Sequence, residues 1–377
     1  MKNNNEENEK AFKNFISEEV LDKLGSAILK VYPNFKLMDF QILKKNLKSL
    51  ELKQRVELIC AKLFKLLPQD YKIALGILID ATRVGDLRGF ELWPFTHYIN
   101  SYGLNDFTKS MEAMMFFTPR FTAEFSIRPF LKNNPEETYN WLTKLISHPD
   151  VHIRRWISEG TRPRLPWGGN IEHAIKNPKA GLLLLEKLYL DSEIYVRKSV
   201  ANHLNDISKD HPHLVINILK KWNKSVAPDF KVQFQWLMRH ALRTLIKKGD
   251  LNALELMGAK GNLNIKVSDI ILNQSSQKIS LPGYLDFTLT LGSKEKKVEK
   301  VIIDYAIYYK KKNGLHAPKV YKLKSFLIEP NKKIVIEKKH LLKKITTRKF
   351  YPGEHFLEIQ LNGKKISKKI SWNLSLK

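Results

Sequence analysis

The sequence predicts a mainly α-helical repeat protein that ends in a small all-β sandwich. Between residues 11 and 258 the apolar residues recur with helical spacing almost throughout. A basic motif returns at a nearly constant interval within this stretch, and beyond it the pattern changes to that of short strands. We therefore expect a polar tail at residues 1–10, a helical domain at residues 11–258 and a β domain at residues 259–377.

The basic motif marks an internal repeat in the helical part. The tripeptides that begin at Ile153, Val196 and Met238 each carry arginine in second place, and they recur at intervals of 43 and 42 residues. This period and pattern look like HEAT-type helical pairs, which stack into a curved solenoid with a concave binding face. The helical spacing is clearest at residues 19–31 and 50–67.

The C-terminal part contains about seven short segments with strand character. They cover residues 262–268, 284–291, 298–309, 319–328, 333–337, 357–361 and 364–372. Asn362-Gly363 joins the last two segments and predicts a tight hairpin. Short strands of this number favour a β-sandwich.

Charge is distributed unevenly between the two parts. Residues 261–377 hold 25 Lys+Arg and 9 Asp+Glu, a net charge of +16, and the remaining residues hold 40 and 29, a net charge of +11. The smaller β domain is therefore the more cationic part. Its lysines are candidate phosphate contacts, although a solvated lysine surface would give the same composition.

The composition excludes several classes of protein. The 377 residues are 43% hydrophobic and 27% charged, and no run approaches 18 consecutive apolar residues. The polar N-terminus carries no signal core, and the single cysteine excludes a multi-cysteine metal site. No glycine-rich phosphate loop and no metal-ligand spacing occurs. We therefore expect a cytoplasmic protein without metal or cofactor, with no membrane partner, and we infer no obligate protein partner.

The formal net charge of +27 indicates an acidic partner, with nucleic acid first. A general bias toward lysine and asparagine would also raise the charge. Arginine separates these interpretations, because the chain has 13 Arg beside 52 Lys and six of the 13 lie between residues 120 and 164. Where lysine is the common cation, a local choice of arginine indicates planar recognition of carboxylate or phosphate.

The segment 148–170 concentrates unusual residues around one carboxylate. Helical spacing followed by glycine and proline places Glu159 at the C-terminal end of a helix. The helix dipole disfavours a negative charge there, and Arg155, four residues earlier, can compensate it. Trp156 and Trp167 flank the same carboxylate. These residues fit a functional site and an ordinary helix-end ion pair with a core tryptophan equally well.

Two further carboxylates stand in unusual surroundings. Glu124 lies in TAEFSIRPFL with Arg128 four residues on, and Asp206 follows two asparagines in SVANHLNDISKDHP. A repeat layer 43 residues later stacks the helix of Asp206 beside that of Glu159. Three carboxylates on neighbouring layers can therefore line one pocket, although a helix-surface ion pair explains each acid taken alone.

Several distinctive strings resemble the AlkC branch of the AlkC/AlkD family of bacterial DNA alkylation-repair glycosylases. They are FTAEFSIRPFL, HIRRWISEGTRPRLPWG and YVRKSVANHLNDISKDHP, with ELKQRVELICAKLFKLLPQDY and LRGFELWPFTHYI nearer the N-terminus. The resemblance covers roughly residues 15–258 and implies a HEAT-like superhelix. Some AlkC members add a C-terminal immunoglobulin-like domain, which fits residues 259–377.

The resemblance also implies an activity. The reaction is excision of N3-alkylated bases from double-stranded DNA, chiefly 3-methyladenine and also 3-methylcytosine, without full base flipping. No lysine in these motifs is placed as a Schiff-base nucleophile, so a monofunctional hydrolase is expected. The family's active-site carboxylates fall on Glu124, Glu159 and Asp206, and its active-site tryptophan falls on Trp167, which gives the expected catalytic residues. Its arginines fall on Arg155 and Arg162.

Basic residues in and after the central segment are candidate DNA contacts. They are Arg154, Arg155, Arg162, Arg164, Lys198 and Lys209. The alternative function is a non-catalytic HEAT-repeat protein that binds nucleic acid through charge, and a third is a scaffold for an acidic partner. Acids clustered with tryptophan and arginine favour the enzyme, because carboxylates that face phosphates only weaken a pure binder.

Overall fold

The computed structural model describes residues 12–260, 263–273, 277–345 and 348–376, and the tail predicted at residues 1–10 lies outside them. The chain divides into two compact units. The first holds the chain up to Asp210 together with Pro228–His240, and the second holds His211–Ala227 and the chain from Ala241 onward. Within the described ranges, no helix combines the length and apolar character needed to span a membrane.

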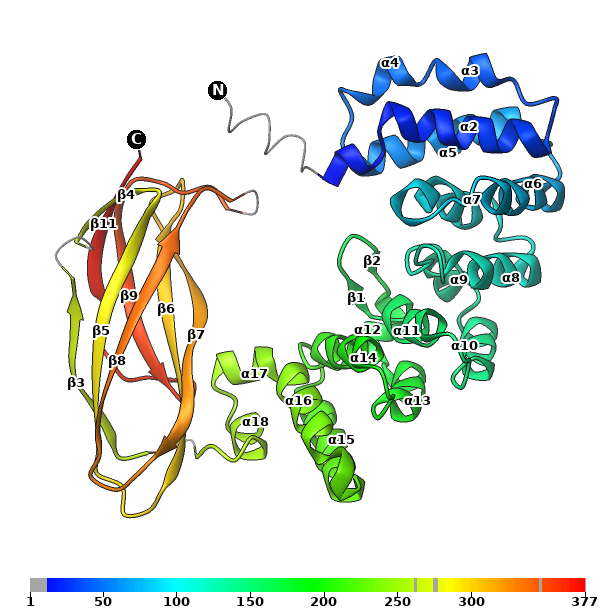
Figure 1. Cartoon of the computed structure of the whole chain (residues 1–377). Coiled ribbons are helices and arrows are strands. Elements are labelled where there is room, and N and C mark those ends of the chain that lie inside the picture. The colour runs from blue at the N-terminus through cyan, green and yellow to red at the C-terminus, as the bar shows by residue number, and fades with distance from the viewer. Residues whose placement is uncertain (1–11, 261–262, 274–276, 346–347, 377) are drawn as a thin grey trace. The chain divides into compact units, whose positions relative to one another are not determined.

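The first unit is built almost entirely of helices (Figure 1). A short hairpin of β1 (Arg164–Leu165) and β2 (Gly169–Asn170) interrupts them. The helices predicted at residues 19–31 and 50–67 are confirmed as α2 and α5. The helices are α2 (Glu18–Val31), α3 (Leu37–Gln41), α4 (Lys44–Leu47), α5 (Leu52–Leu66), α6 (Tyr71–Val84), α7 (Trp93–Tyr102), α8 (Phe107–Phe117), α9 (Arg128–Asn133), α10 (Pro135–Lys144), α11 (Val151–Gly160), α12 (Glu172–Lys176), α13 (Lys179–Leu188), α14 (Ile194–Ile207) and α16 (Lys231–Ala241), with 3-10 turns at Phe12–Phe15, Gly89–Leu92 and Pro228–Phe230.

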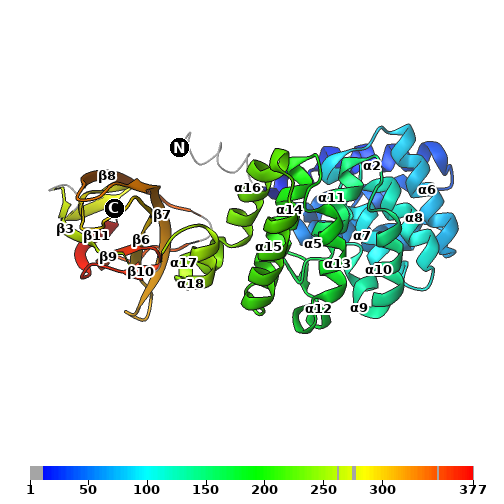
Figure 2. The ribbon, with the colours of Figure 1, turned by 90° about the horizontal axis from the view of Figure 1, so that it is seen from below.

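The helices of this unit form two layers. In one layer α2 packs on α6, α6 on α8, and α10 on α13, and in the other α5 packs on α7, α7 on α9, and α11 on α14. Figure 2, a view from below, shows these helices side by side with roughly aligned axes. The apolar stripe of α11 faces the core, where Trp156 and Ile157 are fully buried. Stacked helices around a continuous core confirm the predicted HEAT-like arrangement.

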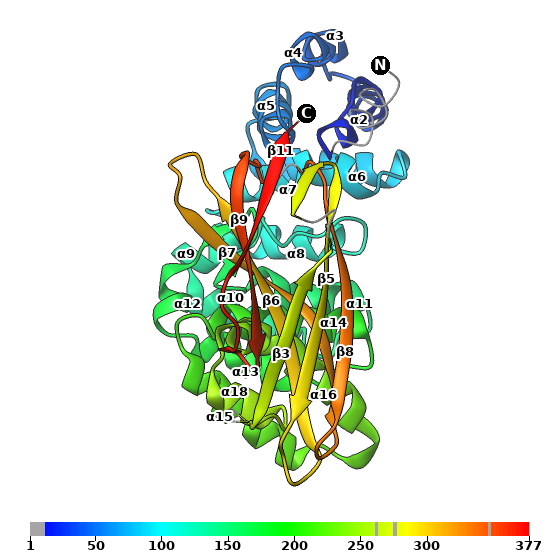
Figure 3. The same cartoon turned by 90° about the vertical axis from the view of Figure 1, so that its left-hand side faces the viewer.

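The second unit joins helices to a β-sandwich, whose strands face the viewer in Figure 3. One sheet has the strand order β3-β5-β8, and the other has β4-β11-β9-β6-β7 with β10 paired to β9. Burial alternates along β5, which places one face of its sheet on the core. The elements are α15 (Pro212–Ser225), α17 (Arg243–Lys248), α18 (Leu251–Leu256), β3 (Ile265–Leu272), β4 (Lys278–Leu281), β5 (Gly283–Ser293), β6 (Glu299–Lys310), β7 (His316–Ile328), β8 (Lys333–Leu342), β9 (Gly353–Leu361), β10 (Lys364–Lys365) and β11 (Ile370–Leu376).

The predicted hairpin is confirmed, but its second strand is shorter than expected. Asn362 and Gly363 both have positive φ, at 44° and 73°, as this tight turn requires. The segment expected as one strand at 364–372 divides into β10 and β11. Ser367 lies between them, and its side chain accepts from the backbone amide of Ile359 in β9 at 2.9 Å.

The change from helix to strand falls between Leu256 and Ile265. The compact unit that holds the sandwich begins earlier, because α18 packs on α15 and α17 within it. The strand β4 is not among the predicted segments, because four residues followed by proline carry little periodic signal. The domain boundary after Gly258 stays a prediction.

Candidate active site

The three predicted carboxylates lie on neighbouring elements of one helical layer. Glu124 lies in the turn before α9, Glu159 in the last turn of α11, and Asp206 in the last turn of α14. All three are buried, with 9%, 5% and 2% of their surfaces exposed. Because α11 packs directly on α14, the repeat brings Glu159 and Asp206 together as its period predicts.

Local sequence fixes the helix that carries Glu159. The Asp150 carboxylate caps the start of α11 by accepting from the backbone amides of His152 at 2.7 Å and Ile153 at 3.3 Å. At the other end, a Cβ on Gly160 would lie 2.8 Å from Ile127 Cγ2. A larger residue does not fit there, so the last turn of α11 lies tightly against the segment that carries Glu124.

Arginines join the carboxylates into a continuous ladder. Arg155 contacts Glu124 through Nη1 and lies 3.5 Å from Glu159 Oε1 through Nη2. Arg162 Nη1 donates to Glu159 Oε1 at 2.6 Å, and its Nε donates to Asp206 Oδ2 at 2.8 Å. The order is therefore acid, arginine, acid, arginine, acid. This arrangement confirms the compensation of Glu159 by Arg155 that the four-residue spacing predicts.

The ladder keeps both arginines charged although they are buried. Burial disfavours the charged form of Arg155, but the carboxylates beside it, Glu124 first, outweigh burial and raise its pKa. For Arg162 burial acts in the same direction, and Glu159 and Asp206 together raise its pKa. Lys209 Nζ lies 2.8 Å from the other oxygen of Asp206, so three cations balance three carboxylates.

A hydroxyl chain holds the second oxygen of Glu159. Ser199 on α14 donates to Glu159 Oε2 at 2.7 Å, and Ser158 donates to Ser199 at 2.7 Å. The fully buried His203 donates from Nδ1 to the Ser158 carbonyl at 3.0 Å, and burial lowers its pKa to about 4. Sequence reasoning missed these residues. Ser199 lies seven residues before Asp206, and this spacing on one helix face was the available signal.

Arg128 organises the loop behind the ladder. Its buried guanidinium donates to four backbone carbonyls, those of Gly160 at 3.0 Å, Arg162 at 2.8 Å, Gly168 at 2.9 Å and Gly169 at 2.6 Å. Burial first, and then the nearby Arg162, lower its pKa to about 10. The guanidinium thereby ties the end of α11 to the β1–β2 hairpin.

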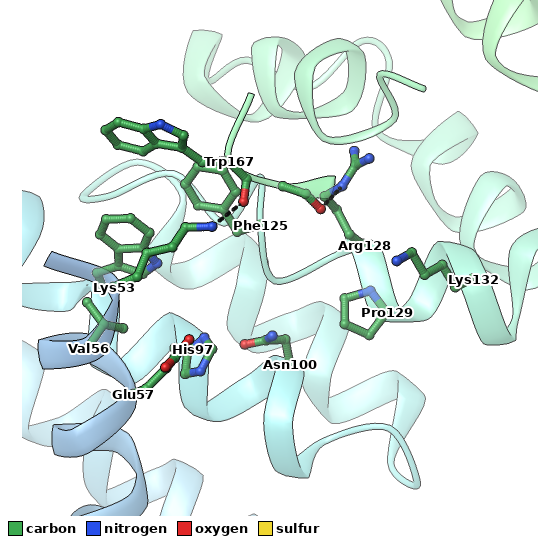
Figure 4. Close-up of a pocket in the computed structure, with 12 residues that line it drawn as sticks. Lys53, Val56, Glu57, His97, Asn100, Phe125, Arg128, Pro129, Lys132 and Trp167 are labelled. Atoms are coloured by element: carbon green, nitrogen blue, oxygen red, sulfur yellow. Dashed lines mark hydrogen bonds between the residues drawn. The ribbon is translucent and has the colours of Figure 1, made fainter. Parts of the chain in front are cut away.

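The two predicted tryptophans have different environments. Trp156 is fully buried in the core, whereas Trp167 in the hairpin loop is 56% exposed and has a φ of 66°. The Trp167 carbonyl accepts from Lys53 Nζ (Figure 4). Its ring is nearly parallel to that of Trp93, with centroids 6.3 Å apart, and Trp93 stacks on Phe125 at 5.3 Å. Because Phe125 directly follows Glu124, these ring contacts connect the exposed Trp167 to the segment that carries the first acid of the ladder.

The other predicted basic residues are divided between ion pairs and the surface. Arg154 donates to both oxygens of Asp191, at 2.7 and 3.1 Å, and to two carbonyls before α11. Arg164 pairs with Asp210 at 2.9 Å, and both side chains are about one-third exposed. Lys198 is exposed. The DNA contacts of these residues stay predictions. In the structure Arg154 connects α11 to the segment before α14 through its bonds to Asp191.

The chemistry of the site is that of carboxylates and cations. Among the described residues, no group of three or more His, Cys, Asp or Glu side chains could hold a metal ion. The ladder can stabilise positive charge that develops nearby, and its hydroxyls and carboxylates can orient water.

Comparisons with known proteins show the family to which this chain belongs. A family model described as the C-terminal Ig-like domain of the uncharacterised protein YhaZ matches residues 268–375. The uncharacterized protein YhaZ of Bacillus subtilis is 36% identical over 353 residues, which cover 93% of this chain and 96% of that protein.

A solved structure gives the same family. It is the alkylpurine DNA glycosylase AlkC of Pseudomonas fluorescens, bound to DNA containing an abasic site analog. That structure is similar with a TM-score of 0.89 and 35% identity, over 97% of this chain and 99% of the other. The chain therefore belongs to the AlkC-type DNA alkylation-repair glycosylase family, in the form with a C-terminal immunoglobulin-like domain.

Proposed function

We propose that this chain is a monofunctional DNA glycosylase that hydrolyses the N-glycosidic bond of cationic N3-alkylated bases in duplex DNA. The supporting observation is the buried ladder of Glu124, Glu159 and Asp206 beside an exposed tryptophan on a rigidly held hairpin. The relation to an alkylpurine DNA glycosylase at 35% identity supports the same class of reaction.

The substrate supplies the leaving group, and the protein supplies negative charge. A base alkylated at N3 is cationic and leaves as a neutral molecule, while positive charge develops on the sugar. Carboxylates fixed before the reaction stabilise that oxocarbenium-like sugar without reorganisation. A carboxylate can also position the water that completes hydrolysis.

Exposure separates the roles of the three acids. The side chain of Glu124 is 12% exposed, against 7% for Glu159 and 2% for Asp206. We assign contact with the sugar or the water to Glu124 and Glu159. Asp206 then acts through Arg162, whose Nε it binds while Glu159 binds Nη1.

The ladder arginines have a positioning role in this proposal. Their guanidinium groups are used by carboxylates, so Arg155 and Arg162 hold the acids in place. Phosphate contacts then fall to residues nearer the surface, first to the exposed Lys198. Arg164 and Lys209 are also partly exposed, but each already pairs with an aspartate.

The exposed ring recognises the cationic nucleotide. An indole face attracts a cation through its quadrupole, and the interaction strengthens when water is excluded. The positive φ of Trp167 and its backbone bond to Lys53 orient the ring before any ligand arrives. This arrangement favours recognition of the lesion without full base flipping.

The site suits charged lesions only. The three carboxylates face cations, and the neutral His203 is buried and bonded to the Ser158 carbonyl. No group in the ladder is therefore placed to protonate a leaving base. Uncharged lesions such as uracil need that proton, and cationic 3-methyladenine and 3-methylcytosine do not.

Base release tests the proposal directly. Purified protein is incubated with methylated duplex DNA, and the free bases are separated by chromatography. Release of 3-methyladenine by the wild type, lost in Glu159→Gln, supports the enzyme. DNA binding without any release would leave the alternative of a non-catalytic HEAT-repeat nucleic-acid-binding protein.

A further inference from the structure

A cavity of about 200 Å³ lies beneath the loop that carries Trp167. It is lined by α5, α7, α9, the segment before α9 and the hairpin loop, and none of its lining residues belongs to the ladder or to the hydroxyl chain that supports it. Figure 4 shows Lys53 reaching the Trp167 carbonyl above it, with His97 and Asn100 below and Lys132 at the side.

Aromatic rings form one wall of this cavity. Trp93 and Phe125 stack with centroids 5.3 Å apart and an interplanar angle of 19°. The Trp167 ring lies 10° from parallel to Trp93. Trp93 is itself buried, so the exposed ring of Trp167 is the one that can offer its face to a flat heterocycle, and such stacking has little preference among bases.

The opposite side of the cavity is polar. Glu57, His97 and Asn100 line it from α5 and α7. Burial lowers the pKa of His97, so this imidazole is neutral and offers one donor and one acceptor. The carboxylate of Glu57 accepts, and the amide of Asn100 does both.

Asn100 provides the specific indication of a ligand. Its Oδ1 is buried, and among the described residues it has no hydrogen-bond partner. A buried acceptor without a partner costs stability, and native proteins rarely keep one without a reason. A ligand edge that offers a donor at this point removes the cost.

We propose that this cavity binds a free purine base, the product released at the neighbouring ladder. The inference rests on the proposed function, because that reaction supplies the base. The volume lies below the range of about 300–1,000 Å³ that drug-sized ligands occupy, so it suits one heterocycle rather than a nucleotide. The aromatic wall stacks on the face of the base, and the polar side forms hydrogen bonds with its edge.

The asparagine specifies adenine among the bases. An asparagine amide pairs with adenine by accepting from the N6 amino group and donating to N7. Methylation at N3 leaves that edge unchanged, so 3-methyladenine keeps both groups. The cavity therefore holds the neutral product after the glycosidic bond breaks, and the enzyme is inhibited by its own product.

Direct binding tests this site without any catalytic step. Titration calorimetry of the full chain with free adenine and free 3-methyladenine should give saturable binding at a single site. Asn100→Leu should weaken it at least about tenfold, because leucine can form neither of the paired hydrogen bonds. Asn105→Leu, at an exposed asparagine after the same helix, is the matched control and should bind as the wild type does.

A second measurement uses the wild type alone. Transferred nuclear Overhauser effects should link the methyl protons of 3-methyladenine to indole and phenyl protons of Trp93, Trp167 and Phe125. Absence of saturable binding, equal binding by Asn100→Leu, or binding without these contacts overturns the proposal. A wild type that excises bases but binds no free base refutes this inference alone, whereas one that binds the base without excising any refutes the proposed function.

Discussion

Replacement of Glu159 by glutamine removes one negative charge from the centre of the ladder. In the wild type Arg162 donates to Oε1 of Glu159 at 2.6 Å and Ser199 donates to Oε2 at 2.7 Å. In the variant the amide oxygen can take the place of Oε1 and accept from Arg162, while the amide nitrogen takes the place of Oε2 and donates to the Ser199 hydroxyl, which can accept after it rotates. Arg155 keeps Glu124 and Arg162 keeps Asp206 as ionic partners. Each arginine is left with one carboxylate in place of two, and the shape of the site is preserved.

The expected effects on stability and on rate are of different size. Weakening a hydrogen bond between a charged pair costs about 1.5–3 kcal/mol, so Glu159→Gln should lower the free energy of unfolding by this amount and remain folded. Loss of one preorganised group that stabilises developing charge costs about 10²–10³-fold in rate. Excision should therefore fall far more than the modest loss of stability can explain.

Single-turnover excision of 3-methyladenine from a duplex oligonucleotide is the assay, with urea unfolding measured in parallel. The matched control is Glu137→Gln, at an exposed acid in the first turn of α10, which should match the wild type in both measurements. A folded Glu159→Gln protein that excises at the wild-type rate would refute the electrostatic role of the ladder.

The clamp at Arg128, the buried His203 and the lysines of the β domain each give a further prediction. Arg128→Lys should lower the free energy of unfolding by about 3 kcal/mol and also slow excision, because lysine cannot serve four carbonyls; unchanged urea unfolding would contradict the clamp. The pKa of His203 is lowered to about 4 against about 6.5 when unfolded, so the unfolded chain binds the extra proton and stability falls as pH falls between these values. From pH 7 to pH 5 the loss should be about 2 kcal/mol and should be absent in His203→Gln; equal pH dependence of both proteins would show that His203 is not buried as a neutral group. Joint Lys311→Gln, Lys312→Gln and Lys319→Gln substitution at exposed positions of the β domain should reduce the slope of log K against log salt for DNA by about 0.9 for each phosphate that these lysines neutralise, and an unchanged slope would remove them from the interface.

The sequence could predict contacts that depend on spacing along one helix or on the repeat. Arg155 and Glu159 are four residues apart, and the layer period places Asp206 beside Glu159. Both follow from helix geometry and need no tertiary information. The change to strands near Gly258 is equally visible, because the apolar period changes there.

Contacts between distant segments could not be predicted in this way. Arg128 lies four residues after Glu124, and this spacing suggested an ion pair between the two side chains. In the structure the guanidinium of Arg128 instead donates to backbone carbonyls 32 to 41 residues further along the chain. The stack of Trp167 on Trp93 and the bond from Lys53 join different layers of the solenoid. The apolar periodicity of a sequence predicts which face of a helix is buried, but it does not predict which loop covers that face.

The most direct test of the central claim is the range of bases that the protein releases. Duplexes with 3-methyladenine, 3-methylcytosine, uracil or 1,N6-ethenoadenine are incubated with the protein, and the free bases are quantified by chromatography. The proposed mechanism predicts release of 3-methyladenine and 3-methylcytosine and negligible release of the two uncharged lesions, because the ladder offers negative charge and no proton. Efficient release of uracil would show that one of the three acids is protonated, and it would contradict the mechanism.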